Sequence, residues 1–128
     1  MNNVIHTYLK ALESGDAHTI IELFTNEGIV YSPLYGRMKA QEFYKDLFKD
    51  TASSSITLLN TFESVESPFI IAAHFIYCWT MKDGVVTQFE CVDIFSCDSA
   101  MKIMELRIIY DTAKTRRAFE NLSSKSVS

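Results

Sequence analysis

Asp93 is the residue of this 128-residue chain whose surroundings point most directly to chemistry. It lies between Val92 and Ile94, inside a segment whose other members are mostly apolar. A carboxylate in such a place needs partners, or it keeps its proton, because loss of solvation raises the pKa of a buried acid. A protonated carboxyl donates a hydrogen bond, which can stabilise negative charge that develops on a substrate oxygen. The alternative is a structural aspartate tied to a neighbouring side chain.

His74 is predicted to face Asp93 from the preceding strand. If Asp83 and Gly84 form a two-residue hairpin turn, counting back from that turn sets His74 opposite Asp93. Opposed residues share one face of a sheet, with Cβ atoms about 5 Å apart. His74 could then be a base that Asp93 orients, or a core histidine that satisfies a buried acid. A one-residue bulge would turn it to the other face.

The other nucleophilic side chains give weaker signals. Cys78 and Cys91 share the predicted face of His74, but buried thiols are usually inert. Ser32 could bind a ligand or merely end its strand, and no nucleophile-elbow glycines surround it. The His, Asp and Glu residues form no metal-ligand motif, so we expect no metal and no cofactor.

Helices are expected in the first part of the chain to position these groups. Apolar side chains recur at helical spacing in residues 3–14, 16–28 and 40–50. Tyr8 lies on the apolar stripe of the first segment. An aromatic residue at such a position is more often part of the core than catalytic, although a buried phenol needs a hydrogen-bond partner. A short strand is expected at residues 29–32, and a short last helix from residue 111 or 112 to 119.

From Ser55 onward the pattern changes to strands rich in Ile, Val, Thr, Phe and Tyr. Four strands are expected, at residues 56–63, 68–81, 85–97 and 102–110. Helices followed by long antiparallel strands predict an α+β domain with the helices on one face of the sheet. Phe75, Tyr77, Val92 and Ile94 are then expected on the uncovered face, which we predict to be the contact of a homodimer.

Several short segments, in this order and spacing, resemble one known superfamily. They are Tyr8–Asp16, Ile21–Phe24, Ser32–Pro33, Gln41–Tyr44, Val92–Phe95 and Lys102–Arg107. Together they resemble the nuclear-transport-factor-two-like proteins, which include ketosteroid isomerases and SnoaL-like polyketide cyclases. The resemblance implies a cone-shaped half-barrel, with N-terminal helices packed in the concave face of a curved, mostly antiparallel sheet. We expect this single domain at residues 1–122 and a flexible Ser-rich tail at 123–128.

The resemblance also implies roles for individual residues. Tyr8 falls where a ketosteroid isomerase has its oxyanion-binding tyrosine, and Asp93 falls where that enzyme has its protonated aspartate. The resemblance therefore implies that Asp93 is the partner of the Tyr8 phenol. The proton-shuttling base falls at Ser32, whose hydroxyl cannot act as a carboxylate base. Steroid isomerisation is therefore expected to be absent or feeble, and His74 would take the role of the base.

The predicted pocket is an apolar cup with a few convergent polar groups, as small-ligand sites usually are. Alternation from Asp93 and the inner stripe of the third helix predict its ligand-binding lining: Val30, Ser32, Phe43, Leu47, Ile76, Cys78, Phe89, Cys91, Met104, Leu106, Ile108 and Tyr110. One hypothesis is an acid–base isomerase, cyclase or dehydratase acting on a small apolar carbonyl or hydroxyl compound. The other is a non-catalytic hydrophobic-ligand-binding or dimeric interaction module. This second hypothesis takes precedence if His74 points to the outer face.

The composition and charge of the chain exclude several classes of protein. The chain has 48% hydrophobic and 22% charged residues, an ordinary globular balance, and its net charge of −4 gives no footprint for nucleic acid or anionic membrane. No apolar run approaches the roughly 20 residues of a membrane helix, and no signal-peptide pattern opens the sequence. The three cysteines lack C-x-x-C spacing and are expected to be reduced. We therefore expect a single-domain cytoplasmic protein.

Overall fold

The computed structural model describes residues 2–127, in which helices come first and long strands follow. The elements are α1 (Asn2–Ser14), α2 (Ala17–Glu22), β1 (Phe24–Ser32), β2 (Gly36–Lys39), α3 (Ala40–Asp50), β3 (Thr51–Glu63), β4 (Ile70–Met81), β5 (Val86–Cys97), β6 (Ile103–Ile109) and α4 (Thr115–Val127).

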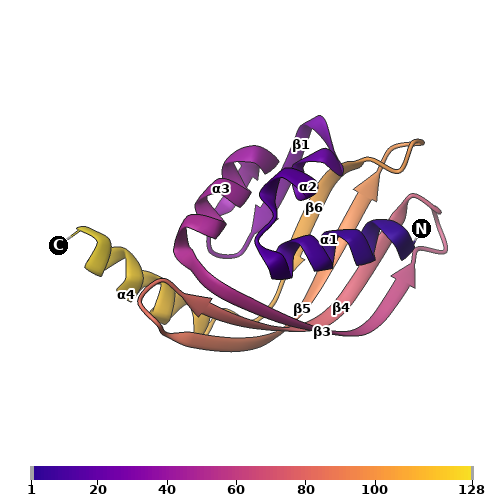
Figure 1. The fold of residues 1–128 in the computed structure, drawn as a ribbon. Coiled ribbons are helices and arrows are strands. Elements are labelled where there is room, and N and C mark those ends of the chain that lie inside the picture. The colour runs from indigo at the N-terminus through magenta and orange to yellow at the C-terminus, as the bar shows by residue number, and fades with distance from the viewer. Residues whose placement is uncertain (1, 128) are drawn as a thin grey trace.

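The six strands form one curved, open sheet in the order β2-β1-β6-β5-β4-β3. The pair β1 and β6 is parallel, and the other neighbours are antiparallel. Helices α1, α2 and α3 lie together over the concave face (Figure 1). The predicted α+β architecture, with N-terminal helices in the concave face of a mostly antiparallel sheet, is confirmed.

The second helix is shorter than the apolar pattern predicts. Asp16 caps α2 by accepting a hydrogen bond from the Thr19 amide at 3.1 Å, but the helix ends at Glu22. The next residues join the sheet, because the Leu23 carbonyl accepts from the Ile103 amide at 2.8 Å. A helix to residue 28 is therefore wrong.

The hairpin between β4 and β5 has a three-residue turn where two residues were predicted. Met81 and Val85 close the turn through a backbone hydrogen bond of 2.9 Å, and Gly84 takes a φ of +89°. Every pair along the hairpin is therefore shifted by one residue. Ala73 lies opposite Asp93, and His74 lies opposite Val92.

This shift exchanges the two faces of β4, because neighbouring residues of a strand point to opposite sides. Phe75 and Tyr77 are buried on the concave face, so the prediction that they lie on the outer face is wrong. His74, Ile76 and Cys78 alternate with them on the outer face and are only half-buried. Outer-face positions predicted for β5 are unaffected by the shift, since they alternate with buried Asp93.

Strand β6 contains a second irregularity, which moves Met104 out of the concave face. Ser96 of β5 pairs with Glu105, whereas its neighbour Cys97 pairs with Ile103, so Met104 is the extra residue of a bulge. Its side chain is 44% exposed, and the prediction that Met104 lines the pocket is wrong. Beyond the bulge, Leu106 is fully buried.

The last helix, α4, includes residues 123–127 of the segment predicted as a tail, and Ser128 lies outside the described residues. Two contacts join α4 to the β1–β2 connection. The Phe119 ring packs on Tyr35 with centroids 4.9 Å apart, and Arg116 donates to the Pro33 carbonyl at 2.7 Å. In the described part of the chain, no helix has the length and apolar character needed to span a membrane.

Candidate functional site

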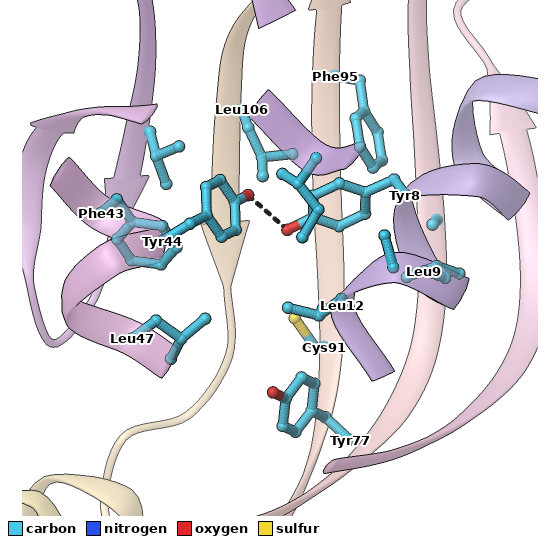
Figure 2. Packing of buried hydrophobic residues seen from close by; sticks show 14 of the residues in the cluster. Tyr8, Leu9, Leu12, Phe43, Tyr44, Leu47, Tyr77, Cys91, Phe95 and Leu106 are labelled. Atoms are coloured by element: carbon cyan, nitrogen blue, oxygen red, sulfur yellow. Dashed lines mark hydrogen bonds between the residues drawn. The ribbon is translucent and has the colours of Figure 1, made fainter. Parts of the chain in front are cut away.

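A narrow cavity of about 50 Å³ lies between the helices and the concave face of the sheet, and it is partly open to solvent. Eight of its 15 lining residues are aromatic, so its walls are mainly ring surface. The lining consists of Tyr8, Leu12, Ser32, Leu34, Tyr35, Phe43, Leu47, Phe75, Tyr77, Trp79, Phe89, Cys91, Asp93, Ile108 and Tyr110. Several of these residues are drawn in Figure 2.

Asp93 is the one carboxyl group in the cavity lining, which contains no Lys, Arg or His. Its side chain is 1% exposed, and burial raises its pKa to about 7. The Cys91 thiol donates to Asp93 Oδ1 at 3.1 Å and opposes that rise in part. Within residues 2–127, no ion pair involves Asp93. The carboxyl group therefore exchanges its proton near neutral pH without a cationic partner.

Tyr8 of α1 and Tyr44 of α3 join their hydroxyl groups at 2.7 Å in the buried core (Figure 2). Burial raises the pKa of both phenols well above the usual range, so both keep their protons. Each of the two hydroxyl groups carries one proton, and their mutual hydrogen bond uses only one of them. The other proton is free to be donated elsewhere. If Tyr44 donates to Tyr8, the Tyr8 phenol can offer its own proton to the cavity.

Asp93 is not the hydrogen-bond partner of Tyr8, although the resemblance supplied it as one. Tyr8 is bound to Tyr44, and Asp93 is bound to Cys91. The Asp93 carboxylate nevertheless raises the pKa of the Tyr8 phenol through its charge. The two groups are thus electrostatic neighbours that both line the cavity.

Three other ring donors of the lining are directed to partners behind it. They are the Tyr35 phenol, which donates to Asp50 at 2.6 Å, the Trp79 indole, which donates to Thr51 at 2.7 Å, and the Tyr77 phenol, which shares a hydrogen bond of 2.7 Å with Ser54. The Ser32 hydroxyl oxygen accepts from two backbone amides of the following turn, at 3.3 and 3.2 Å. The cavity therefore presents aromatic surface, one carboxyl group and few free donors.

His74 lies on the outer face of the sheet, where its Nε2 is 2.6 Å from Glu90 Oε2 and its Nδ1 is 3.1 Å from Asn60 Nδ2. It is absent from the cavity lining, so the prediction that it faces Asp93 is wrong. The physical reason is the extra residue in the hairpin turn. The cavity has no histidine base.

The structure brings most of the predicted pocket residues together. Those in the lining are Tyr8, Ser32, Phe43, Leu47, Phe89, Cys91, Asp93, Ile108 and Tyr110. Val30 and Leu106 are fully buried in the core without lining the cavity. Ile76 and Cys78 were predicted to bind ligand, but the register shift places them on the outer face.

Sequence reasoning missed Leu12, Leu34, Tyr35, Phe75, Tyr77 and Trp79 of the lining, and Tyr44 behind it. The strand residues among them follow from the hairpin once its turn has three residues. Tyr44 was visible as a second phenol on the apolar stripe of α3. Tyr35 lies in a connection where no periodic pattern could have indicated its direction.

The described residues contain no group of three or more His, Cys, Asp or Glu side chains placed to hold a metal ion. The chemistry that the site itself offers is proton donation and acceptance by Asp93 and hydrogen bonding by Tyr8.

Neither a family model nor a curated protein matches the sequence, but many solved structures share its fold. An NTF2-like protein of unknown function from Burkholderia pseudomallei superposes with a TM-score of 0.76 at 13% identity, over 90% of this chain and 93% of that one. The Δ5-3-ketosteroid isomerase of Mycobacterium sp. gives 0.72 at 21% identity, over 86% and 92%. SalBIII, an epoxide hydrolase/cyclase-like enzyme in pyran ring formation of salinomycin, gives 0.72 at 18%, over 86% and 89%.

These likenesses confirm the predicted fold: the chain has the nuclear-transport-factor-two-like fold, which is also the fold of the ketosteroid isomerase and of the epoxide hydrolase/cyclase-like enzyme. Identities this low establish the fold and leave the activity to be argued from the site.

Proposed function

We propose that this chain binds a small, largely apolar molecule in its aromatic cavity, and that Asp93 and Tyr8 hold an oxygen atom of that molecule. The observation that carries the proposal is a buried carboxyl group without a counter-ion in an aromatic cavity. In its neutral state Asp93 donates one hydrogen bond to the ligand oxygen. When Tyr44 donates to Tyr8 in their shared hydrogen bond, the Tyr8 phenol donates a second hydrogen bond to the ligand oxygen, strengthened by the one that it receives.

The size of the cavity limits the ligand to a few non-hydrogen atoms. At about 50 Å³ the cavity has room for a few water molecules, far less than a steroid skeleton occupies. With Ser32 in place of a carboxylate base as well, steroid isomerisation is expected to be absent or feeble.

Binding takes precedence over catalysis because the cavity lacks a second acid–base group. His74 is on the outer face, and the Ser32 oxygen is engaged by backbone amides. If Asp93 removes the proton, Tyr8 alone is left to support the charge that develops on the ligand oxygen.

Titration with tert-butanol, followed by protein NMR, tests the binding proposal. We expect shifts confined to cavity residues, and Asp93→Asn or Tyr8→Phe should each weaken binding by up to about tenfold, the value of one good hydrogen bond. Glu42→Gln, an exposed carboxyl group on α3, is the matched control and should bind like the wild type. Shifts on the outer face alone, with none in the cavity, would contradict the proposal.

Acid–base catalysis is the second candidate, favoured by the pKa of about 7 at Asp93. In this alternative the Asp93 carboxylate removes a proton from the carbon beside a ligand carbonyl, Tyr8 stabilises the enolate oxygen, and the carboxyl group then returns a proton to carbon. With acetone in D₂O, the proton held by Asp93 exchanges with solvent before it is returned, so the cycle replaces α-hydrogens by deuterium, which NMR detects as signal loss. Exchange no faster with wild type than with Asp93→Asn would leave binding as the function.

We also propose that two copies of the chain pair through the outer face of the sheet. Val92 and Ile94 lie there half-buried, beside exposed Ile109. Helices cover only the opposite face, and a row of apolar side chains on an uncovered sheet is typical of a contact surface.

A further inference from the structure

We propose that the same cavity also binds a small organic cation of the alkylammonium class, with ionised Asp93 as its counter-ion. One proton on Asp93 then decides which class of ligand the cavity accepts: neutral oxygen compounds when the proton is present, ammonium ions when it is absent. The inference rests on the proposed binding cavity, and it adds a ligand class that the neutral-ligand proposal does not contain.

The charge distribution of the cavity supports a cationic ligand. Ionised Asp93 would be a buried negative charge whose one hydrogen bond in the described structure comes from Cys91, a weak donor. The cavity lining supplies no basic side chain to neutralise it. A buried carboxylate is costly unless a positive group pairs with it, and an ammonium ion supplies both the charge and the donors.

The walls of the cavity are suited to the same class of ligand. Aromatic rings attract cations through the negative face of their π-systems, and they accommodate the apolar alkyl groups of an ammonium ion. The Tyr35 phenol and the Trp79 indole already donate to partners behind the lining, and the Tyr77 phenol shares a hydrogen bond there, so these rings offer few free donors to a neutral polar ligand. Ring surface with a single acid is the composition that small organic cations bind.

No other group around Asp93 changes its charge near neutral pH. The titratable side chains whose pKa the Asp93 charge raises come from α1, α3, β4, β5 and the segment after β6, and they are Tyr8, Tyr44, Tyr77, Cys91 and Tyr110. Burial raises the pKa of every one of them, so all stay neutral. Asp93, with a pKa of about 7, is the group that titrates.

The sign of the pH dependence follows. An ammonium ion binds the ionised carboxylate better than the neutral acid, so its binding lowers the pKa of Asp93 and releases a proton below neutral pH. Its affinity must therefore rise with pH. A neutral alcohol that accepts a hydrogen bond from protonated Asp93 has the opposite or no dependence.

Two probes of the same shape separate the classes: tert-butylammonium and tert-butanol. Titrated into wild-type protein at about pH 5.5 and about pH 8.5, tert-butylammonium should bind roughly 30-fold more tightly at the higher pH, because the ionised fraction of a group with a pKa near 7 rises by that factor. The amine itself keeps its proton over this range. Calorimetry in two buffers of different ionisation enthalpy should count close to one proton released per ion bound at the lower pH.

The variants assign the effect to one residue. Asp93→Asn should lose at least tenfold in affinity for tert-butylammonium at the higher pH, lose the pH dependence, and still bind tert-butanol. Glu42→Gln should behave as the wild type. The proton count needs only wild-type protein, so it decides the question even if Asp93→Asn does not fold.

The outcomes also separate this inference from the proposed function. If tert-butanol binds in the cavity and tert-butylammonium binds at neither pH, or binds without pH dependence, the cation site is wrong and the neutral-ligand site stands. If neither probe shifts cavity residues, both proposals are wrong.

Discussion

At the scale of single residues, Asp93 is a buried carboxyl group for which residues 2–127 provide no cationic partner. Its burial follows from sequence alone, since alternation between Val92 and Ile94 turns it toward the core. Its one partner was equally accessible: Cys91 lies two residues earlier on the same strand, hence on the same face. The carboxyl group should therefore affect folding as well as binding.

We predict that Asp93 makes the protein less stable as pH rises from about 4 to about 7. In an unfolded chain the carboxyl group loses its proton near pH 4, whereas in the folded protein its pKa is about 7. Unfolding within this window releases a proton, so higher pH favours the unfolded state. The contribution of protonated Asp93 is complete below the unfolded pKa and is lost by the folded pKa, at up to about 1.4 kcal/mol per pH unit.

Urea denaturation of wild type and Asp93→Asn across this range measures the effect. Because asparagine does not titrate, the free energy of unfolding of the variant should lack this fall. The difference between variant and wild type should therefore grow in favour of the variant by a few kcal/mol from about pH 4 to about pH 7. Glu42→Gln should show no such trend. A constant difference between wild type and Asp93→Asn would mean that the folded pKa is not raised.

At the scale of elements, the length of the turn between β4 and β5 decides which side chains of β4 face the cavity. The sequence Asp83-Gly84 was interpreted as a two-residue turn, but Gly84 takes its positive φ as the last residue of a three-residue turn. Both turns use the same residues, and nothing local in the sequence distinguishes them. The difference comes from packing, because the observed register buries Phe75 and Tyr77 with Asp93 and leaves His74 beside solvent.

Gly84→Ala should lower the free energy of unfolding by about 1 kcal/mol, because an alanine at this φ of +89° is strained. No atom lies within 4 Å of the position where the new Cβ would be, so the cost comes from the backbone alone. Gly84→Asn should cost less, because asparagine tolerates left-handed backbone better than alanine. Equal stability of Gly84→Ala and wild type in urea denaturation would show that the turn relaxes or that the register is not fixed there.

The helices and the later strands could be predicted because their apolar periodicity is strong, while pairing between distant segments could not. The apolar run of α2 continues to Phe24, and a helix ending at Gly28 was a consistent interpretation. Instead Phe24 pairs with Ile103 in β6, and Gly28 allows close approach, since a Cβ there would lie 2.7 Å from the Phe24 ring. A partner about 80 residues away in the sequence leaves no local pattern.

At the scale of the whole molecule, the fold could be predicted from the order of its elements, and about half of the candidate site with it. Tyr8 and Asp93 line one cavity because both positions depend on short-range periodicity. His74 does not, because its position depended on one turn. The error also changes the outer face, to which β4 contributes His74 instead of the predicted aromatic side chains.

The outer face remains the surface through which we expect two copies to pair. We predict a homodimer at micromolar concentration, with Val92 and Ile94 inside the contact, and Phe75 and Tyr77 no longer part of it. Ile94→Asp should convert the dimer to a monomer that keeps its fold, because an unpaired charge in an apolar contact costs several kcal/mol while a half-exposed charge in the monomer does not. Gln41→Arg, on the exposed face of α3, is the control and should leave the dimer intact. Sedimentation velocity measures both states, and circular dichroism checks the fold of each variant. A wild-type monomer at these concentrations would contradict pairing through the outer face.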